Sequence, residues 1–452
     1  MAHIAHDPSV KPDFKTTMDL GAVLPQTAQV KDGHLWIGGV DTVELAQQFG
    51  TALYVMDEEH IRTQLRKFLE WTRYHWADVD VVYAGKAFIC KAMCKLVQEE
   101  GCFLDVSSGG ELAIAMAAGF PAERIVSHGN NKTIRELTEA IEAGVGRIVA
   151  DSFEELDRID QLAQARGVRQ PVLVRITPGV VADTHEYIQT AAEDSKFGFG
   201  LRDGLAHEAV KKAVSLPGID FRGLHMHIGS QIFVLNSFAK AIEVVVGFME
   251  EIRDQTGCVV AELDTGGGLG IAYGVPDEPS TIEQFGKVIV DDIKEQCMQR
   301  SLPVPHIMIE PGRAVVANAG VTLYTVGTIK HIPHIRTYVA VDGGMTDNIR
   351  TALYGAHYEP TIANKADQPR DTVVTVAGKH CESGDVVTID APLQQAQAGD
   401  VLCVFATGAY CQSMASNYNK QVRPGVVFVK DGQARLVVRR ETYEDLMSCD
   451  LD

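Results

Sequence analysis

The sequence lacks any long apolar run. No stretch of the 452 residues approaches the roughly 20 apolar residues that a membrane-spanning helix requires. Residues 1–10 also lack the apolar segment behind a basic start that marks a secretory signal. We therefore expect a cytoplasmic protein without a membrane partner.

Basic residues are in deficit. The chain has 41 Lys and Arg residues against 60 Asp and Glu residues, which gives a formal net charge of −19 at pH 7. Binding to the phosphate backbone of a nucleic acid or to an anionic surface favours the opposite balance. Nucleic acid is therefore not an expected partner.

Paired cysteines are also lacking. The nine cysteines are scattered without a Cys-x-x-Cys motif, so neither a disulfide framework nor a zinc site is indicated. Cys90 and Cys94 share one face of a predicted helix, where core packing explains them better than metal ligation because no His or carboxylate accompanies them. We expect no metal site.

What the chain does have is a regular alternation of short apolar strands and amphipathic helices. Its length exceeds that of one ordinary core, so we expect two domains. The strands predicted for the first domain are residues 79–84, 102–106, 124–127, 147–150, 171–176, 221–227, 261–265 and 306–309. Eight such repeats predict an α/β fold, a (β/α)₈ TIM-type barrel over residues 46–314. An open doubly wound sheet is the alternative.

A barrel of this kind predicts where the chemistry lies, because active sites in such barrels lie at the carboxyl ends of the strands. The predicted strand ends carry, in order, Lys86, Asp105, His128, Asp151, Arg175, His227, Gly266-Gly267-Gly268 and Glu310. Buried charges are costly unless they are paired or used. Titratable groups at nearly every strand end therefore predict an active site.

Lys86 follows the strand at residues 79–84 directly. Loss of water at the end of a core strand favours the neutral amine, which is a nucleophile toward aldehydes. Lys86 is therefore a candidate Schiff-base lysine. The structural alternative is a lysine that merely extends its amine from the strand end into solvent.

The ends of the seventh and eighth strands carry the most specific pattern. Barrels often bind phosphate there, and three consecutive glycines, Gly266 to Gly268, let backbone N–H groups approach an anion. A dinucleotide fingerprint fails because Ile271 occupies the position of its last glycine; a tight turn is the plain alternative. Glu310 and Arg313 then follow the eighth strand. The Glu310 carboxylate could hold a pyridine nitrogen protonated, and the Arg313 guanidinium could bind a carboxylate or a phosphate. The structural alternative is that the two side chains simply form an ion pair with each other.

His225 and His227 are expected on one face of their strand, since side chains alternate with a period of two. Two histidines so placed could ligate a metal, but no third ligand is marked. We interpret His227 as a flat ring partner for a cofactor, with Ser230 placed to donate to its phosphate.

The second predicted domain is all-β, Greek-key or sandwich-like, and is built from both chain ends, residues 1–45 plus 315–452. Its strands are predicted at 321–331, 337–341, 373–376, 386–390 and 401–405, with a hairpin over 426–438 that turns at Asp431-Gly432. We expect residues 29–38, which have their own Asp32-Gly33 turn, to join that sheet; a separate hairpin is the alternative.

Three loops of this second domain carry candidate functional residues. Residues 379–385 hold Cys381 beside Glu382, where a turn needs only Gly and Asp. A thiol beside a cationic cofactor can donate a proton. Residues 342–354 and 407–410 place Arg350, Tyr354 and Tyr410 next to glycines, although each of these signals is weak by itself.

Motifs at seven places occur in the order found in diaminopimelate decarboxylases. They are Tyr83-Ala84-x-Lys86-Ala87-Phe88, His227-Ile228-Gly229-Ser230-Gln231-Ile232, Gly266-Gly267-Gly268, Glu310-Pro311-Gly312-Arg313, Asp347-Asn348-Ile349-Arg350, Cys381-Glu382-Ser383-Gly384-Asp385 and Gly408-Ala409-Tyr410. Over nearly its whole length the chain resembles this family of fold-type III pyridoxal-phosphate decarboxylases. Residues 86–88, 128–132 and 378–381 are most similar to actinobacterial members, while Gly85 departs from the family's Ala, Val or Ser.

The resemblance implies a reaction, the decarboxylation of meso-2,6-diaminopimelate to L-lysine and CO₂ as the last step of lysine biosynthesis. Lys86 would hold pyridoxal phosphate as a Schiff base, and Glu310 would keep its pyridine nitrogen protonated so that the ring accepts the electrons released with CO₂. His227 would stack on the ring. The other cofactor-binding residues that we expect are Asp105, Ser230, Gly266, Gly267, Gly268, Gly312, Arg313 and Tyr410.

The resemblance also implies how the substrate is selected. The substrate-binding residues would be Arg313, Arg350, Tyr354, Glu382 and Tyr410. Cations would take the distal carboxylate and Glu382 the distal ammonium, so that lysine or ornithine would leave buried groups unpaired. Cys381 would be the catalytic proton donor. In the family this cysteine and glutamate reach into the partner's active site, which implies a homodimer with shared sites.

Three other functions are weighed against this one. Ornithine, lysine and arginine decarboxylases share the fold and cofactor but usually have Cys-Asp where this chain has Cys381-Glu382. An alanine racemase would use a tyrosine of the β domain and would not need the Cys-Glu-Ser-Gly-Asp loop. A regulatory paralogue would be expected to lose Lys86 or Cys381, and both are present.

The long connection at residues 177–200 is the segment that we expect to close over the site. Its candidate residues are His185, Glu186, Lys196 and Phe197.

Overall fold

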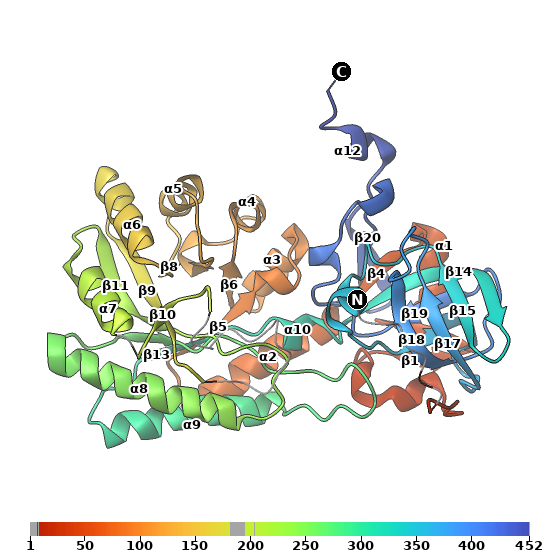
Figure 1. Cartoon of the computed structure of the whole chain (residues 1–452), viewed down its shortest axis with the longest axis horizontal. Coiled ribbons are helices and arrows are strands. Elements are labelled where there is room, and N and C mark those ends of the chain that lie inside the picture. The colour runs from red at the N-terminus through yellow and green to blue at the C-terminus, as the bar shows by residue number, and fades with distance from the viewer. Residues whose placement is uncertain (1–6, 8, 181–194, 203, 452) are drawn as a thin grey trace. The chain divides into compact units, whose positions relative to one another are not determined.

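The structure is a computed structural model that describes residue 7 and residues 9–180, 195–202 and 204–451. The chain divides into two compact units (Figure 1). The barrel unit comprises residues 64–270 and 279–312, and the β unit comprises residues 1–63, 271–278 and 313–452.

Eight parallel strands form the barrel unit. They are β5 (Val79–Ala84), β6 (Phe103–Val106), β7 (Ile125–Ser127), β8 (Arg147–Ala150), β9 (Gln170–Thr177), β11 (Ile219–His225), β12 (Glu262–Asp264) and β13 (His306–Ile309). Each strand pairs with the next, and β13 pairs with β5, which closes the ring; the short β10 (Phe199–Gly200) pairs with β9. The predicted TIM-type barrel is therefore confirmed, and an open doubly wound sheet is wrong.

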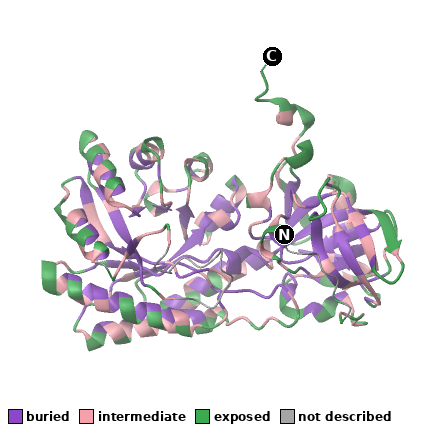
Figure 2. Cartoon of the chain, viewed as in Figure 1, coloured by how far each residue is buried: buried purple, intermediate pink, exposed green. Residues whose placement is uncertain are grey.

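The barrel strands form because their short β-branched runs can be buried on both sides. Val82, Val126, Val149, Leu173 and Met308 come from five different strands and pack into one cluster in which each side chain is fully buried. The strands are correspondingly buried in Figure 2. This packed interior gives the strand ends a rigid base.

Helices surround the strands of the barrel unit in Figure 1. The helices that alternate with the strands along the chain are α2 (Glu58–His75), α3 (Lys91–Glu99), α4 (Gly109–Ala117), α5 (Ile134–Ala143), α6 (Phe153–Ala165), α7 (Leu205–Ser215), α8 (Asn236–Thr256) and α9 (Ile282–Gln299). Ser108, Thr133 and Ser152 cap α4, α5 and α6, since each side-chain oxygen accepts from a backbone N–H of the first turn. In the described residues no helix combines the length and apolarity that crossing a membrane requires.

The β unit is built on a mixed sheet. Its strands are β4 (Leu53–Asp57), β14 (Gly320–Ile332), β15 (Arg336–Val341), β16 (Pro360–Ile362), β17 (Thr372–Ala377), β18 (Val386–Leu393), β19 (Val401–Val404), β20 (Gly425–Lys430) and β21 (Gln433–Val438). The predicted hairpin between β20 and β21 is confirmed, and its turn residues Asp431 and Gly432 both have positive φ, as a tight hairpin requires.

The expectation that residues 29–38 join this sheet is wrong. They form β1 (Gln29–Lys31) and β2 (His34–Ile37), and β2 pairs on its other edge with β3 (Val40–Asp41), which gives a separate three-stranded sheet. The place in the mixed sheet is taken by β4, which pairs with both β14 and β20. All five residues of β4 are buried, so its sequence has no alternation that marks it as a strand.

Strand β4 falls within the range 46–314 predicted for the barrel domain, and the first segment of the β unit extends to Thr63. The domain limits drawn from the sequence otherwise stay a prediction. Strand β11 ends at His225 rather than at His227, because the chain leaves the regular ladder there. This difference separates the two histidines that we expected on one face.

Candidate active site

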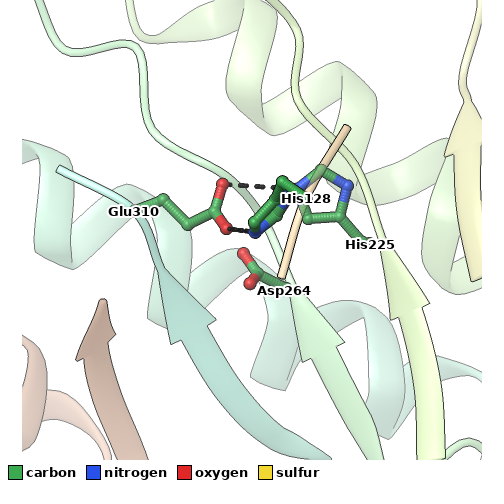
Figure 3. A group of neighbouring side chains, drawn as sticks. All are labelled: His128, His225, Asp264 and Glu310. Carbon is green, nitrogen blue, oxygen red and sulfur yellow. Dashed lines mark hydrogen bonds and ion pairs between the residues drawn. The ribbon is translucent and has the colours of Figure 1, made fainter. Parts of the chain in front are cut away.

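Four buried polar side chains meet at the carboxyl ends of the barrel strands (Figure 3). His128 follows β7, His225 and Asp264 end β11 and β12, and Glu310 follows β13. Nε2 of His128 lies 2.6 Å from Oε1 of Glu310, and Nε2 of His225 lies 3.3 Å from Oε2. Each of the four residues has one side-chain nitrogen or carboxylate oxygen that lies within 4.8 Å of the corresponding atoms of the other three.

The charges of this cluster follow from burial and from the neighbours. Burial by itself would raise the pKa of Glu310, but the two histidines hold it well below its usual value. Burial lowers the pKa of His225 to about 3, whereas the pKa of His128 is raised because the Glu310 and Asp105 charges outweigh its burial. Burial, with Glu310 nearby, raises the pKa of Asp264 well above its usual value. These shifts favour an anionic Glu310, a protonated His128 and a protonated, uncharged Asp264, and they leave His225 neutral.

Lys86 and Asp105 belong to the same neighbourhood. Lys86 lies in the short helix η2 (Gly85–Ala87) directly after β5, and Asp105 is a fully buried residue of the adjacent β6. Burial raises the pKa of Asp105, while the positive charges of His128 and Lys86 act against that rise. The barrel thus brings a lysine amine and three carboxyl groups, those of Asp105, Asp264 and Glu310, to one end.

His227 faces the glycine loop rather than Glu310. Its Nδ1 accepts from the N–H of Gly267 at 3.3 Å, which requires that nitrogen to be unprotonated. The pKa of His227 lies well below its usual value, because burial and the cations of Lys86 and Arg175 disfavour another positive charge. His227 is therefore a neutral ring.

The loop after β12 tolerates only glycine. A Cβ at Gly267 would lie 2.0 Å from the carbonyl oxygen of Glu310, and one at Gly268 would lie 2.4 Å from that of Gly229. Gly266 has φ of 68°, and its N–H donates to Asp264 at 2.8 Å. This close packing holds the glycine loop against the backbone of Gly229, and the next residue, Ser230, is partly exposed.

The β unit has a second polar cluster, built from arginines and tyrosines. Buried Arg313 donates to the hydroxyl of Tyr273, and its guanidinium carbon lies 4.8 Å from the centre of the Tyr410 ring. Nε of Arg350, also buried, donates to the hydroxyl of Tyr358 at 2.9 Å. The rings of Tyr273, Tyr354 and Tyr410 lie 5.2–5.7 Å from the Arg350 guanidinium.

Cys381 and Glu382 lie in a loop whose base is tightly fixed. The carboxylate of Asp385 accepts from the backbone N–H groups of Met345 and His380, each at 2.7 Å. The side chains of Cys381 and Glu382 are exposed, and Glu382 accepts from the hydroxyl of Tyr418. The loop therefore presents a thiol and a carboxylate at a surface.

Within the barrel unit, the structure thus gathers Lys86, Asp105, His227, Glu310 and the three glycines, and within the β unit it gathers Arg313, Arg350, Tyr354 and Tyr410. Sequence reasoning missed the setting of Glu310 between two histidines, and it missed Tyr273 and Tyr358. The position of His128 at a strand end was the available signal for the first. Residues 181–194 of the proposed closing segment, with His185 and Glu186, lie outside the described residues.

Comparison with known proteins places this chain in a family. Residues 58–317 match the model of the pyridoxal-binding domain of pyridoxal-dependent decarboxylases. The chain belongs to this decarboxylase family. It is 49% identical to the diaminopimelate decarboxylase of Bacillus subtilis over 94% of this chain and 96% of that protein, and 43% identical to that of Mycobacterium bovis over the same shares.

Solved structures agree with this assignment. The diaminopimelate decarboxylase of M. jannaschii has a TM-score of 0.88 and 36% identity over 94% of this chain and 98% of that one. The enzyme of Helicobacter pylori, solved with L-lysine, has a TM-score of 0.82 and 28% identity over 90% of this chain and 98% of that one.

The resemblance predicted from the motifs is therefore confirmed, and it is not confined to actinobacterial relatives. Pyridoxal phosphate is the cofactor of this family member. The residues present fit this cofactor. Lys86 is a candidate nucleophile for its aldehyde, and Glu310 is a buried anion for its pyridine nitrogen. His227 offers a neutral ring, and the glycine loop offers backbone that can approach a phosphate closely.

Proposed function

We propose that this enzyme removes one carboxylate of meso-2,6-diaminopimelate as CO₂ and releases L-lysine, the last step of lysine biosynthesis, in the cytoplasm. The observation that carries the proposal is Arg350, a buried cation. Among the described residues no carboxylate is ion-paired with it, and three tyrosine rings surround it. A buried cation of this kind favours a substrate that brings a second carboxylate.

The cofactor would be held by the barrel residues. Lys86 would bind it covalently, Glu310 would bond to its pyridine nitrogen and His227 would lie against its ring. Asp105, Ser230, Gly266, Gly267, Gly268, Gly312, Arg313 and Tyr410 complete the proposed set. Bound in this way, the cofactor would accept the electrons that remain on the substrate when CO₂ leaves. Glu310 suits its role because its pKa lies well below the usual value, which keeps it an anion.

Selection of the substrate would rest on the β unit. Arg313 and Arg350 would take the distal carboxylate, with Tyr354 and Tyr410 beside it, while Glu382 would take the distal ammonium. Lysine and ornithine lack that carboxylate, so they would leave a buried guanidinium unpaired and bind weakly. The side-chain hydrogen bond from Arg350 to Tyr358 uses Nε only, so both terminal nitrogens of its fork can serve a carboxylate.

The proton that replaces the lost carboxylate would come from Sγ–H of Cys381. We infer a homodimer in which Cys381 and Glu382 of each subunit reach the active site of the other. The exposure of both side chains on a fixed loop supports this arrangement. A monomer would then lack the proton donor.

The first test is CO₂ release from the purified, cofactor-loaded protein. We expect release from meso-diaminopimelate and none from lysine, ornithine or arginine at equal concentration. Release only from one of the mono-carboxylate amines would support a decarboxylase activity but refute the proposal that Arg313 and Arg350 select a second carboxylate. Absence of CO₂ from all four substrates, with the cofactor bound, would refute the proposed reaction.

A further inference from the structure

Both carboxylate oxygens of Glu310 are held by histidines. Oε1 faces Nε2 of His128 at 2.6 Å, and Oε2 faces Nε2 of His225 at 3.3 Å (Figure 3). The two imidazole rings lie 5.0 Å apart at 67° to one another. Because one oxygen forms an ion pair and the other a hydrogen bond, the carboxylate cannot rotate about its terminal bond without breaking both contacts.

We propose that His128 and His225 are positioning residues that hold Glu310 as an oriented anion for the pyridine nitrogen. The inference rests on the proposed role of Glu310 and deepens it. The two carboxylate oxygens have four lone pairs together, so the two histidine contacts and the contact with Asp264 still leave acceptor capacity for the cofactor. The three residues are carried by different barrel strands, which makes the arrangement rigid.

The two histidines act by different means. His225 is a neutral donor, because its pKa of about 3 leaves it uncharged and its Nε2 must then carry the hydrogen that Glu310 accepts. The raised pKa of His128 favours its protonated form, whose positive charge counters the burial of the Glu310 anion. The other ionisable groups that act on the two imidazoles are Asp105, Lys86 and Arg175, and neutral Asp264 lies in the same cluster.

The surroundings of His128 suit a charged ring. It lines a cavity of about 130 Å³ together with Ser107, Ser127 and Asn130. The hydroxyl and amide groups around this cavity offer polar partners to the ring, although the cation of Lys132 also lines it.

The test compares donors at the two positions. His128→Phe and His225→Phe keep a flat ring and remove the donor, whereas His128→Gln and His225→Gln restore an uncharged donor. His306→Gln is the matched control, because His306 contacts Asp78 and Asp80 at 2.8 and 3.2 Å at the opposite end of β13. Each holoenzyme is loaded with cofactor labelled with ¹⁵N in the ring, and the ¹⁵N chemical shift, kcat and KM are measured.

We expect both Phe variants to move the ¹⁵N shift toward the unprotonated value and to lower kcat about ten- to a hundredfold, with a smaller change in KM. His225→Gln should restore both quantities, His128→Gln only in part, and His306→Gln should change neither. Phe variants that are fully loaded and retain the wild-type ¹⁵N shift and kcat would overturn the proposal. Equal rescue by the two Gln variants would overturn the separate role of the His128 charge.

A second measurement needs no cofactor and covers the case in which a Phe variant fails to fold. NMR of ¹⁵N-histidine in the cofactor-free protein should show His128 protonated at higher pH than a free histidine, and Glu310→Gln should lower that pKa. An unchanged His128 titration in Glu310→Gln would overturn the coupling. By contrast, an unchanged cofactor ¹⁵N shift in the Glu310→Gln holoenzyme would refute the proposed role of Glu310 itself.

Discussion

Replacing Lys132 by Met should destabilise the barrel and loosen the loop that carries His128. Nζ of Lys132 donates to Glu155 at 3.0 Å, to the carbonyl of Gly129 at 2.8 Å and to that of Val149 at 2.6 Å. The side chains of Lys132 and Glu155 are 5% and 4% exposed, so this is a buried ion pair. Breaking such a pair by removing one partner costs about 3–5 kcal/mol, because the other charge stays buried without compensation.

The double variant separates the charge from the packing. Glu155→Gln in the Lys132→Met background removes the uncompensated carboxylate and keeps an oxygen for the N–H of Asp151, which Glu155 accepts at 2.8 Å. We expect the double variant to recover about 1–2 kcal/mol relative to Lys132→Met, the cost of an unpaired buried group. Replacing the exposed Lys95 by Met in α3 is the control and should change the free energy of unfolding by about 0.5 kcal/mol or less.

The assay is urea unfolding at fixed protein and cofactor concentrations, since binding of either a cofactor or a second subunit shifts apparent stability. A loss below about 1 kcal/mol for Lys132→Met would refute the buried-pair reasoning. So would a double variant that is less stable than Lys132→Met alone.

Three further predictions concern turnover and pH. Lys86→Ala should abolish the absorbance of covalently bound cofactor, whereas Cys381→Ala should keep the colour and lose most turnover; an unchanged spectrum in the lysine variant would remove the central assignment. Arg350→Met should lower kcat/KM for meso-diaminopimelate about a hundredfold, the effect of unpairing a buried charged contact, and a loss below tenfold would contradict its role. Burial raises the pKa of Asp347 to about 6 from an ordinary 3.8, so the native state holds this proton more tightly and the associated stability of about 3 kcal/mol is lost as pH rises from about 4 to 6. Unfolding of Asp347→Asn measured across that range should lack this part of the pH dependence, and an identical pH profile for the variant and the wild type would refute it.

Local patterns in the sequence were enough to predict the barrel. The strands at 79–84, 147–150 and 306–309 have the observed bounds, because short β-branched runs bounded by turn residues have few alternative structures. The hairpin at Asp431-Gly432 was predictable for the same reason, since those two residues tolerate the positive φ that the turn needs. Strand β4 escaped prediction because it is buried throughout and shows no period.

The composition and periodicity of the sequence by themselves determined the class of fold, and its ordered motifs determined the family, because both depend on residues that are near one another in the chain. Only the tertiary structure decided which side chains meet. Glu310 is separated by 182 positions from His128 (310 − 128) and by 85 from His225, yet closure of the ring sets all three within hydrogen-bonding distance. His225 and His227 show the same limit: they are two positions apart in the sequence, but one contacts Glu310 and the other Gly267. The charge of each imidazole depends on that contact and on burial, which the sequence alone does not contain.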